Sequence, residues 1–398
     1  MTHQAILTAS LFLLLAFGID RLNRSTGIPS VVVLIITGLL GKPVLASFGL
    51  ELSGLNAAVP VIGTIGLVLI VLEGAFDLEL RRDKLRLAGS AFIAASLGFL
   101  VWTAVFALLA AAALPLELHQ ALLLAIPFAV ISSAVAIPSS VFLPARGREF
   151  IVYESSISDI IGILVFFAFL DSNGTVTGVL MNLAGGGTVS LLLGAVCAVG
   201  LLIALLRLDG HIRFIPLLAA LFALYASGKL LHLSPLIMVL MFGLVLNNPG
   251  LLGRWRWMSS LLAAPGYDGT IREFKALTAE LTFAVRGFFF ILLGYWTDLS
   301  GFAHVEAWLA AILMVVATYG VRYLILRLLR VELADQLTWL APRGLITVLL
   351  YLSAKKAVPV PPYLDGAVML VVLASALAIG LGRSRWTRAQ QRVKAGTT

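Results

Sequence analysis

Long apolar runs recur along almost the whole chain and constrain its fold more than any other feature. Of its 398 residues, 60% are hydrophobic and only 12% are charged, whereas soluble domains carry about 25% charged residues. A helix crosses the hydrocarbon core of a bilayer with about 20 residues. The sequence therefore predicts an all-α polytopic membrane protein with about thirteen spans, approximately at 4–20, 28–45, 57–76, 87–113, 119–143, 150–170, 187–206, 212–230, 234–247, 277–297, 304–329, 333–353 and 364–382.

The basic residues act as topology signals. A net charge of +8 could indicate nucleic-acid binding, but the Lys and Arg residues lie between apolar runs rather than on one soluble face. With thirteen spans and the N-terminus outside, most of them fall in cytoplasmic segments, as expected for inner-membrane proteins. We therefore predict a multi-pass protein of the bacterial inner membrane with a cytoplasmic C-terminus, in contact with the lipid bilayer and not with nucleic acid.

Other classes of chemistry have little support. Cys197 is the only cysteine, so an intramolecular disulfide framework and a cysteine-rich metal site are excluded. The sequence has no G-x-x-x-x-G-K-[ST] phosphate loop, and this argues against ATP-driven pumping. We expect no cofactor, and no metal other than a transported monovalent cation.

The segment from Tyr153 to Gly162 places two carboxylates, Glu154 and Asp159, inside an apolar span. A charge at the bilayer centre costs at least ~2.5–3.5 kcal/mol, so both need a reason. Ser155, Ser158 and Asp159 share one helical face. Such a stripe can supply oxygen ligands to a hard monovalent cation.

The two carboxylates need not share a site, because they are separated by about 140° around the helix. Arg286 lies in another apolar span, and a buried guanidinium needs an anion. We predict that Glu154 and Arg286 form a structural ion pair and that Asp159 exchanges ligands. The alternative for Asp159 is an ion pair that only holds helices together.

Two further spans carry interruptions. Pro127 and Pro138 flank a serine-rich stretch in the fifth span, and Pro342 precedes Arg343 in the twelfth. Proline removes a backbone donor, so both helices should break. Broken helices at matching positions in two halves point to an inverted-repeat transporter. Arg343 could offset exposed carbonyl ends at the second break, or it could reach the cytoplasmic interface.

These motifs resemble those of the monovalent cation:proton antiporter superfamily, which includes the sodium/proton exchangers. The most specific are Glu154 to Asp159, similar to a Glu-x-x-x-Asn-Asp signature; Arg286 to Phe290; and Pro342-Arg343-Gly344. The resemblance implies a homodimer. It also implies a core domain of approximately 87–170 and 304–383, and a dimerisation domain of approximately 1–76 and 187–300.

Two departures bear on the transported ion. Ser158 stands where relatives have Asn or Asp, which favours one proton per cation, and Ser132-Ser133 stands where many have Thr-Asp. The predicted function is an electroneutral exchange of protons for Na⁺, Li⁺ or K⁺. The predicted cation ligands are Asp159, Ser158, Ser155, Ser132 and Ser133. A cation or proton channel, or a membrane-embedded enzyme using Asp159 as acid or base, are the alternatives.

Overall fold

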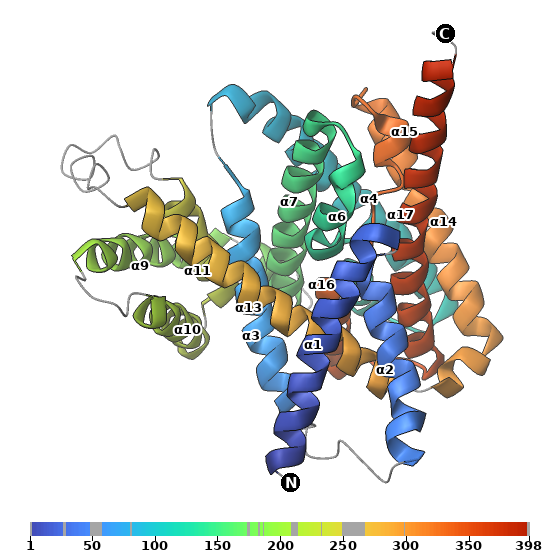
Figure 1. The fold of residues 1–398 in the computed structure, drawn as a ribbon, viewed down its shortest axis with the longest axis horizontal. Helices are drawn as coiled ribbons and strands as arrows, with labels where there is room; N and C mark the ends of the chain where they lie inside the picture. Colours follow the sequence, from blue (N-terminus) through green and yellow to red (C-terminus); the bar gives the residue numbers. More distant parts are fainter. Residues whose placement is uncertain are drawn as a thin grey trace. The chain divides into compact units, whose positions relative to one another are not determined.

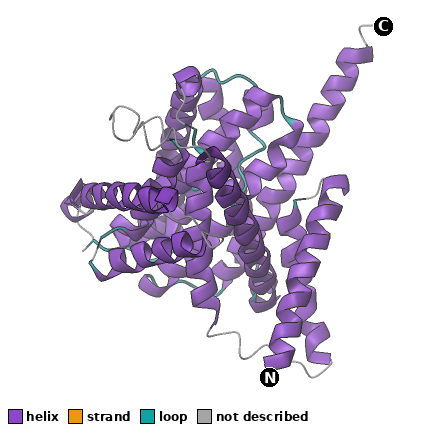
Figure 2. Cartoon of the chain, turned by 60° about the vertical axis from the view of Figure 1, so that its left-hand side comes forward, coloured by secondary structure: helices purple, strands orange, loops and turns teal. Residues whose placement is uncertain are grey.

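The structure is a computed structural model that describes residues 2–26, 29–47, 58–79, 82–172, 176–181, 184–185, 187–207, 214–231, 233–248, 267–297 and 299–395. Within these ranges every regular element is a helix and none is a strand (Figures 1 and 2), which confirms the predicted all-α class. Six of the described helical segments are long and apolar enough to cross a membrane: Leu85–Ala113, Leu118–Phe142, Ala145–Leu170, Gly269–Trp296, Val305–Leu328 and Tyr363–Thr387. The total of thirteen spans stays a prediction.

The chain divides into two compact units. The first comprises Met1–Gly63, Leu87–Ser158 and Ala284–Thr398, and the second comprises Thr64–Arg86 and Asp159–Phe283. Four helices contribute residues to both: α3 (Ala58–Asp77), α4 (Leu85–Ala113), α7 (Ala145–Leu170) and α13 (Tyr267–Trp296). The division into a transport core and a dimerisation domain concerns motion and assembly, and it stays a prediction.

The remaining helices of the first unit are α1 (Thr2–Thr26), α2 (Ser30–Ser47), α5 (Leu118–Ala129), α6 (Ser133–Ser139), α14 (Val305–Leu328), α15 (Ala334–Leu337), α16 (Leu345–Ala357) and α17 (Tyr363–Ala395). In this unit α14 packs on α17, and α5 packs on α16. Gly38 of α2 and Gly294 of α13 face each other so closely that a Cβ on either would overlap the other helix's backbone. Small residues permit such close packing between membrane helices.

The second unit also contains α8 (Val176–Met181), α9 (Gly187–Arg207), α10 (Phe214–Leu230) and α11 (Pro235–Asn247). Helix α11 contacts both α9 and α10. Its end is tied to the end of α3, because the side-chain amides of Asn247 and Asn248 both donate to the carbonyl of Leu78, at 2.9 and 2.8 Å. These bonds satisfy a carbonyl that the end of α3 leaves without a helical partner.

Candidate functional site

The interruptions of two helices meet in the first unit. Helix α5 ends at Ala129 and α6 begins at Ser133, while residues 340–344 before α16 are not helical. The backbone N–H of Ser132 donates to the carbonyl of Pro342 at 2.9 Å. A backbone donor freed by one break therefore satisfies an acceptor freed by the other. The predicted breaks in both helices are present.

Gly344 makes this contact possible. A Cβ at position 344 would lie 2.5 Å from the Oγ of Ser132, well inside van der Waals contact. The two segments approach so closely that a side chain at position 344 would have to displace Ser132, and such a close approach is a common use of glycine. The Oγ of Ser132 is itself buried and has no hydrogen-bond partner among the described residues. An acceptor is therefore left open where the two breaks meet, a place that we call the crossing.

Arg343 is fully buried at the same crossing. Its guanidinium donates to the carbonyl of Val130 at 2.7 Å, and Val130 caps the C-terminus of α5. A cation is favoured at a helix C-terminus, because the last carbonyls carry partial negative charge. The guanidinium carbon also lies 4.7 Å from the ring centroid of Trp102. Arg343 does offset an exposed carbonyl, but this carbonyl lies at the first break, after α5, and not at the second break as predicted. The alternative of an arginine that reaches the interface is wrong, because the side chain is fully buried.

Glu154 is paired with Arg322, not with Arg286. Two guanidinium nitrogens of Arg322 donate to the two carboxylate oxygens at 2.9 and 2.8 Å, and both side chains are 1–3% exposed. The third nitrogen, Nε, donates to the carbonyl of Leu337 at 2.8 Å. This forked geometry is the strong form of an arginine–carboxylate contact. The predicted partner is therefore wrong, because Arg322, assigned to a cytoplasmic segment by the charge pattern, lies inside α14.

Arg286 contacts the helix that contains Pro138, and not Glu154. Its guanidinium donates to the carbonyl of Ala134 at 3.3 Å. In a regular helix that carbonyl would accept from the N–H four residues later, but the residue there is Pro138, which has none. Arg286 thus satisfies an acceptor that the proline leaves open. Pro138 lies inside α6 and does not mark the crossover as predicted, because tertiary hydrogen bonds hold the break at Val130 to Ser132.

The predicted ligands on α7 are all buried. Asp159 is 6% exposed, and Ser155 and Ser158 are at most 1% exposed. The backbone N–H of Ile131, at the break after α5, donates to the Oγ of Ser158 at 3.0 Å. Ser155 donates its hydroxyl to the carbonyl of Ile151 one turn earlier. Ser158 therefore ties α7 to the first break, and Asp159 is the next residue of the same helix.

The hydroxyl oxygens of these serines keep acceptor capacity. A hydroxyl oxygen has two lone pairs and one O–H donor. Ser155 acts as a donor to the carbonyl of Ile151 and keeps both lone pairs, whereas Ser158 accepts one bond and keeps one. Ser133 is likewise buried at the first turn of α6. Among the described residues, no group of three His, Cys, Asp or Glu residues could hold a metal ion.

The sequence analysis missed Thr318 and Arg322 of α14 and Trp102, which lie beside the two helix breaks. The carbonyl of Thr318 accepts from the indole N–H of Trp102 at 3.1 Å, and its hydroxyl lies 3.5 Å from a guanidinium nitrogen of Arg343. Arg322 follows one turn later on α14. Thr318 and Arg322 at i and i+4 form a polar stripe inside an apolar span, and that spacing is the signal that could have identified them.

Comparisons with known proteins identify the family and the fold. The family model described as "Sodium/hydrogen exchanger, transmembrane" matches residues 6–388. The structure of the sodium proton antiporter MjNhaP1 from Methanocaldococcus jannaschii at pH 8 aligns with a TM-score of 0.75 and 20% identity, over 96% of this chain and 97% of that one. An electron-microscopy structure of MjNhaP1 aligns with a TM-score of 0.71 and 19% identity, over 97% and 96%. No curated protein matches. The chain has the antiporter fold and is a multi-pass integral membrane protein.

Proposed function

Because the chain belongs to the sodium/hydrogen exchanger family of secondary transporters, we propose that it exchanges protons for a monovalent cation by alternating access. In this mechanism Asp159 binds either a proton or a cation, and never both. Competition for one carboxylate is enough to couple the two fluxes. The protein is a transporter of that family and not an enzyme.

The observation that supports this proposal is that the two carboxylates on α7 have different surroundings. Glu154 accepts two guanidinium hydrogen bonds from Arg322, and a charge held in this way is committed to the structure. Asp159 lies five residues further along and is buried on a face that also carries hydroxyl groups. A buried carboxylate is stabilised when its charge is neutralised, and a bound proton or cation would do so alternately.

We assign the cation ligands to Asp159 and to hydroxyl oxygens of Ser155, Ser158, Ser132 and Ser133. Hard monovalent cations prefer oxygen ligands, and unwound backbone near helix breaks can supply further carbonyl groups. Ser158 is neutral where a second carboxylate would add a second proton site. The stoichiometry we propose is therefore one proton for one Na⁺, Li⁺ or K⁺, which moves no net charge.

We further propose that residues 87–170 and 304–383 form the moving core and that residues 1–76 and 187–300 form the dimerisation domain. Both breaks, the Glu154–Arg322 pair and Arg343 fall within the first set, as a moving ion site requires. The proposed unit is a homodimer in the bacterial inner membrane, with the N-terminus outside, in keeping with the distribution of Lys and Arg.

The decisive experiment follows a proton gradient across everted vesicles or proteoliposomes with a pH-sensitive dye. Addition of Na⁺, Li⁺ or K⁺ should dissipate the gradient for the transported ion, and a membrane potential imposed with valinomycin should not change the rate. Asp159→Asn should abolish the cation-dependent flux, while the protein elutes as the same folded species. The matched control is Ser156→Ala, which changes a buried hydroxyl on α7 that the proposed site does not use.

Three results would contradict the proposal. Exchange that persists in Asp159→Asn would show that Asp159 is not the carboxylate that protons and cations share. Cation flux without proton flux would indicate a channel. A rate that follows the imposed membrane potential would overturn the electroneutral stoichiometry while leaving exchange intact.

A further inference from the structure

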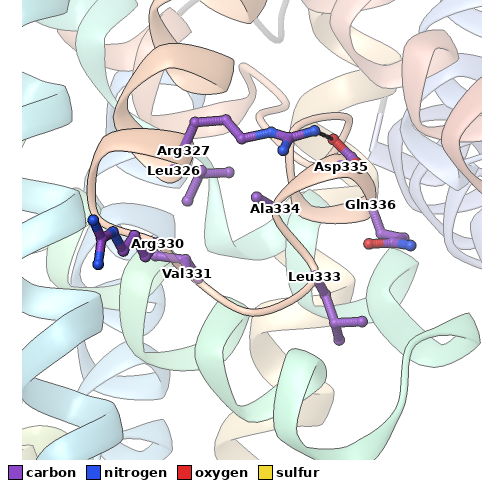
Figure 3. A pocket seen from close by; sticks show the side chains of 8 residues that line it. All are labelled: Leu326, Arg327, Arg330, Val331, Leu333, Ala334, Asp335 and Gln336. Carbon is purple, nitrogen blue, oxygen red and sulfur yellow. Dashed lines mark hydrogen bonds and ion pairs between the residues drawn. The ribbon is translucent and has the colours of Figure 1, made fainter.

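The turn that joins α14 to α15 lines an open surface cavity of about 500 Å³. Its walls come from the segment between Leu326 and Gln336 (Figure 3). Arg330 and Leu333 adopt left-handed backbone conformations, with φ of 50° and 61°, and these bend the chain into a tight loop. In Figure 3 the side chain of Arg327 extends towards Asp335, and the guanidinium of Arg330 lies at the opposite edge of the loop.

The charges around this cavity do not balance. Arg327 donates to Asp335 at 2.8 Å, and its guanidinium carbon lies 5.3 Å from the ring centroid of Tyr323. The neighbouring Glu332 is paired with Arg146 at 3.1 Å. The guanidinium of Arg330 has no hydrogen-bond or ion-pair partner among the described residues. The cavity therefore has an exposed guanidinium at one edge and, at the opposite edge, a second that is oriented by Asp335 and Tyr323. Guanidinium groups are suited to phosphate oxygens.

The outer face of α14 leads to this cavity. Large apolar side chains are exposed along it at Leu313, Val316, Leu324 and Leu328, with exposed fractions from 54% to 71%. Their spacing of three, eight and four residues keeps them on one side of the helix. In a membrane protein such a stripe contacts acyl chains. One leaflet is about 15 Å thick, which corresponds to about ten helical residues, so the last part of the stripe reaches the cavity within one leaflet.

We propose that this cavity binds the phosphate headgroup of an anionic membrane phospholipid, with the acyl chains lying on the exposed face of α14. Arg330 supplies the principal contact and Arg327 the second. Basic pockets at the membrane surface beside helices are suited to such headgroups. The apolar stripe that ends at the cavity favours a lipid over a soluble phosphate.

A bound headgroup would also act on the ion pair at the crossing. The cavity wall includes the first three residues of α15, and the carbonyl of Leu337, the last residue of α15, accepts from Nε of Arg322. Arg322 in turn holds Glu154. An anionic lipid that holds α15 in place should therefore change the exchange rate, an effect that rests on the proposed function.

Binding is tested on the purified full-length protein by native mass spectrometry and by thermal unfolding. The probes are phosphatidylglycerol, phosphatidylcholine and soluble glycerol 3-phosphate. Phosphatidylglycerol should be retained and should raise the unfolding temperature, whereas the zwitterionic lipid should do neither. Arg330→Gln should weaken retention about tenfold or more. Arg86→Gln, which removes an exposed arginine at the start of α4, should leave retention unchanged.

Equal retention of phosphatidylglycerol by Arg330→Gln and the unchanged protein would overturn the site. Equal retention of the two lipids would overturn the selection for an anionic headgroup. Displacement of the lipid by glycerol 3-phosphate at a similar concentration would overturn the role of the apolar stripe.

Reconstitution into liposomes of either lipid separates binding from transport. Faster or slower exchange in phosphatidylglycerol that disappears in Arg330→Gln supports the coupling through α15. If the lipid is retained but the exchange rate does not change, the coupling through α15 is contradicted and the binding site is not. Absence of exchange in every lipid, with retention intact, contradicts the proposed function and not the lipid site.

Discussion

Two arginines, Arg322 and Arg343, are buried in the same unit and are stabilised in different ways. Arg322 on α14 meets a carboxylate, Glu154, through two short hydrogen bonds. Arg343, just before α16, has no carboxylate partner among the described residues. It donates to the carbonyl of Val130 and lies over the face of Trp102. One charge is therefore balanced by an ion and the other by dipoles.

The difference shows what each arginine depends on. An ion pair depends first on its partner, because removing one member leaves an uncompensated buried charge. A guanidinium held by a carbonyl at a helix end and by the face of an aromatic ring needs both that helix end and that ring. Arg343 therefore requires the break after α5, and the exposed carbonyl at that break requires Arg343, whereas the Glu154–Arg322 pair would persist if the helix were continuous.

The largest effect on stability is expected from Arg322→Ala. The substitution strands Glu154 in a buried site and should lower the free energy of unfolding by about 3–5 kcal/mol. Unfolding of the purified protein in detergent, followed by tryptophan fluorescence, measures this loss. The double variant Glu154→Gln with Arg322→Met should recover most of it, because no unpaired charge remains. A single variant as stable as the unchanged protein would show that the pair contributes nothing.

A smaller loss is expected from Arg343→Met. The variant loses a charge-assisted hydrogen bond, which costs about 1.5–3 kcal/mol, but it leaves no buried carboxylate without a partner. Arg343→Lys keeps a positive charge near the Val130 carbonyl and should be intermediate in stability. If Arg343→Met proves more destabilising than Arg322→Ala in the same unfolding assay, the contrast between ion and dipole stabilisation is wrong.

The smallest effect is expected from Arg286→Ala, which removes one longer hydrogen bond to the carbonyl of Ala134. A bond of this kind contributes about 0.5–1.5 kcal/mol. In a Pro138→Ala background the restored N–H can donate to that carbonyl, so Arg286→Ala should then cost less. A double-mutant cycle on unfolding free energies measures the coupling between the two positions. Strictly additive losses of unfolding free energy would show that Arg286 does not compensate for the N–H that Pro138 lacks.

Much of the site could be predicted from residue types that are expensive in a membrane. Glu154, Asp159 and Arg343 stand out in apolar runs because burial of a charge needs compensation, and all three are buried. Pro342 marks a real interruption. The partner of Glu154 could not be predicted in this way, because the charge pattern groups Arg322 with the cytoplasmic arginines. Sequence distance also does not say which helix packs beside α7.

What the sequence alone determined is the all-helical membrane class and the few polar residues that need compensation inside it, since both follow from the cost of transferring polar groups into lipid. The tertiary structure decided which polar groups pair with one another. It joined Ser132 to Pro342, Arg322 to Glu154, and Arg286 to the carbonyl that Pro138 leaves open. These choices depend on distances of about 3 Å between atoms far apart in the chain, and helix packing sets such distances.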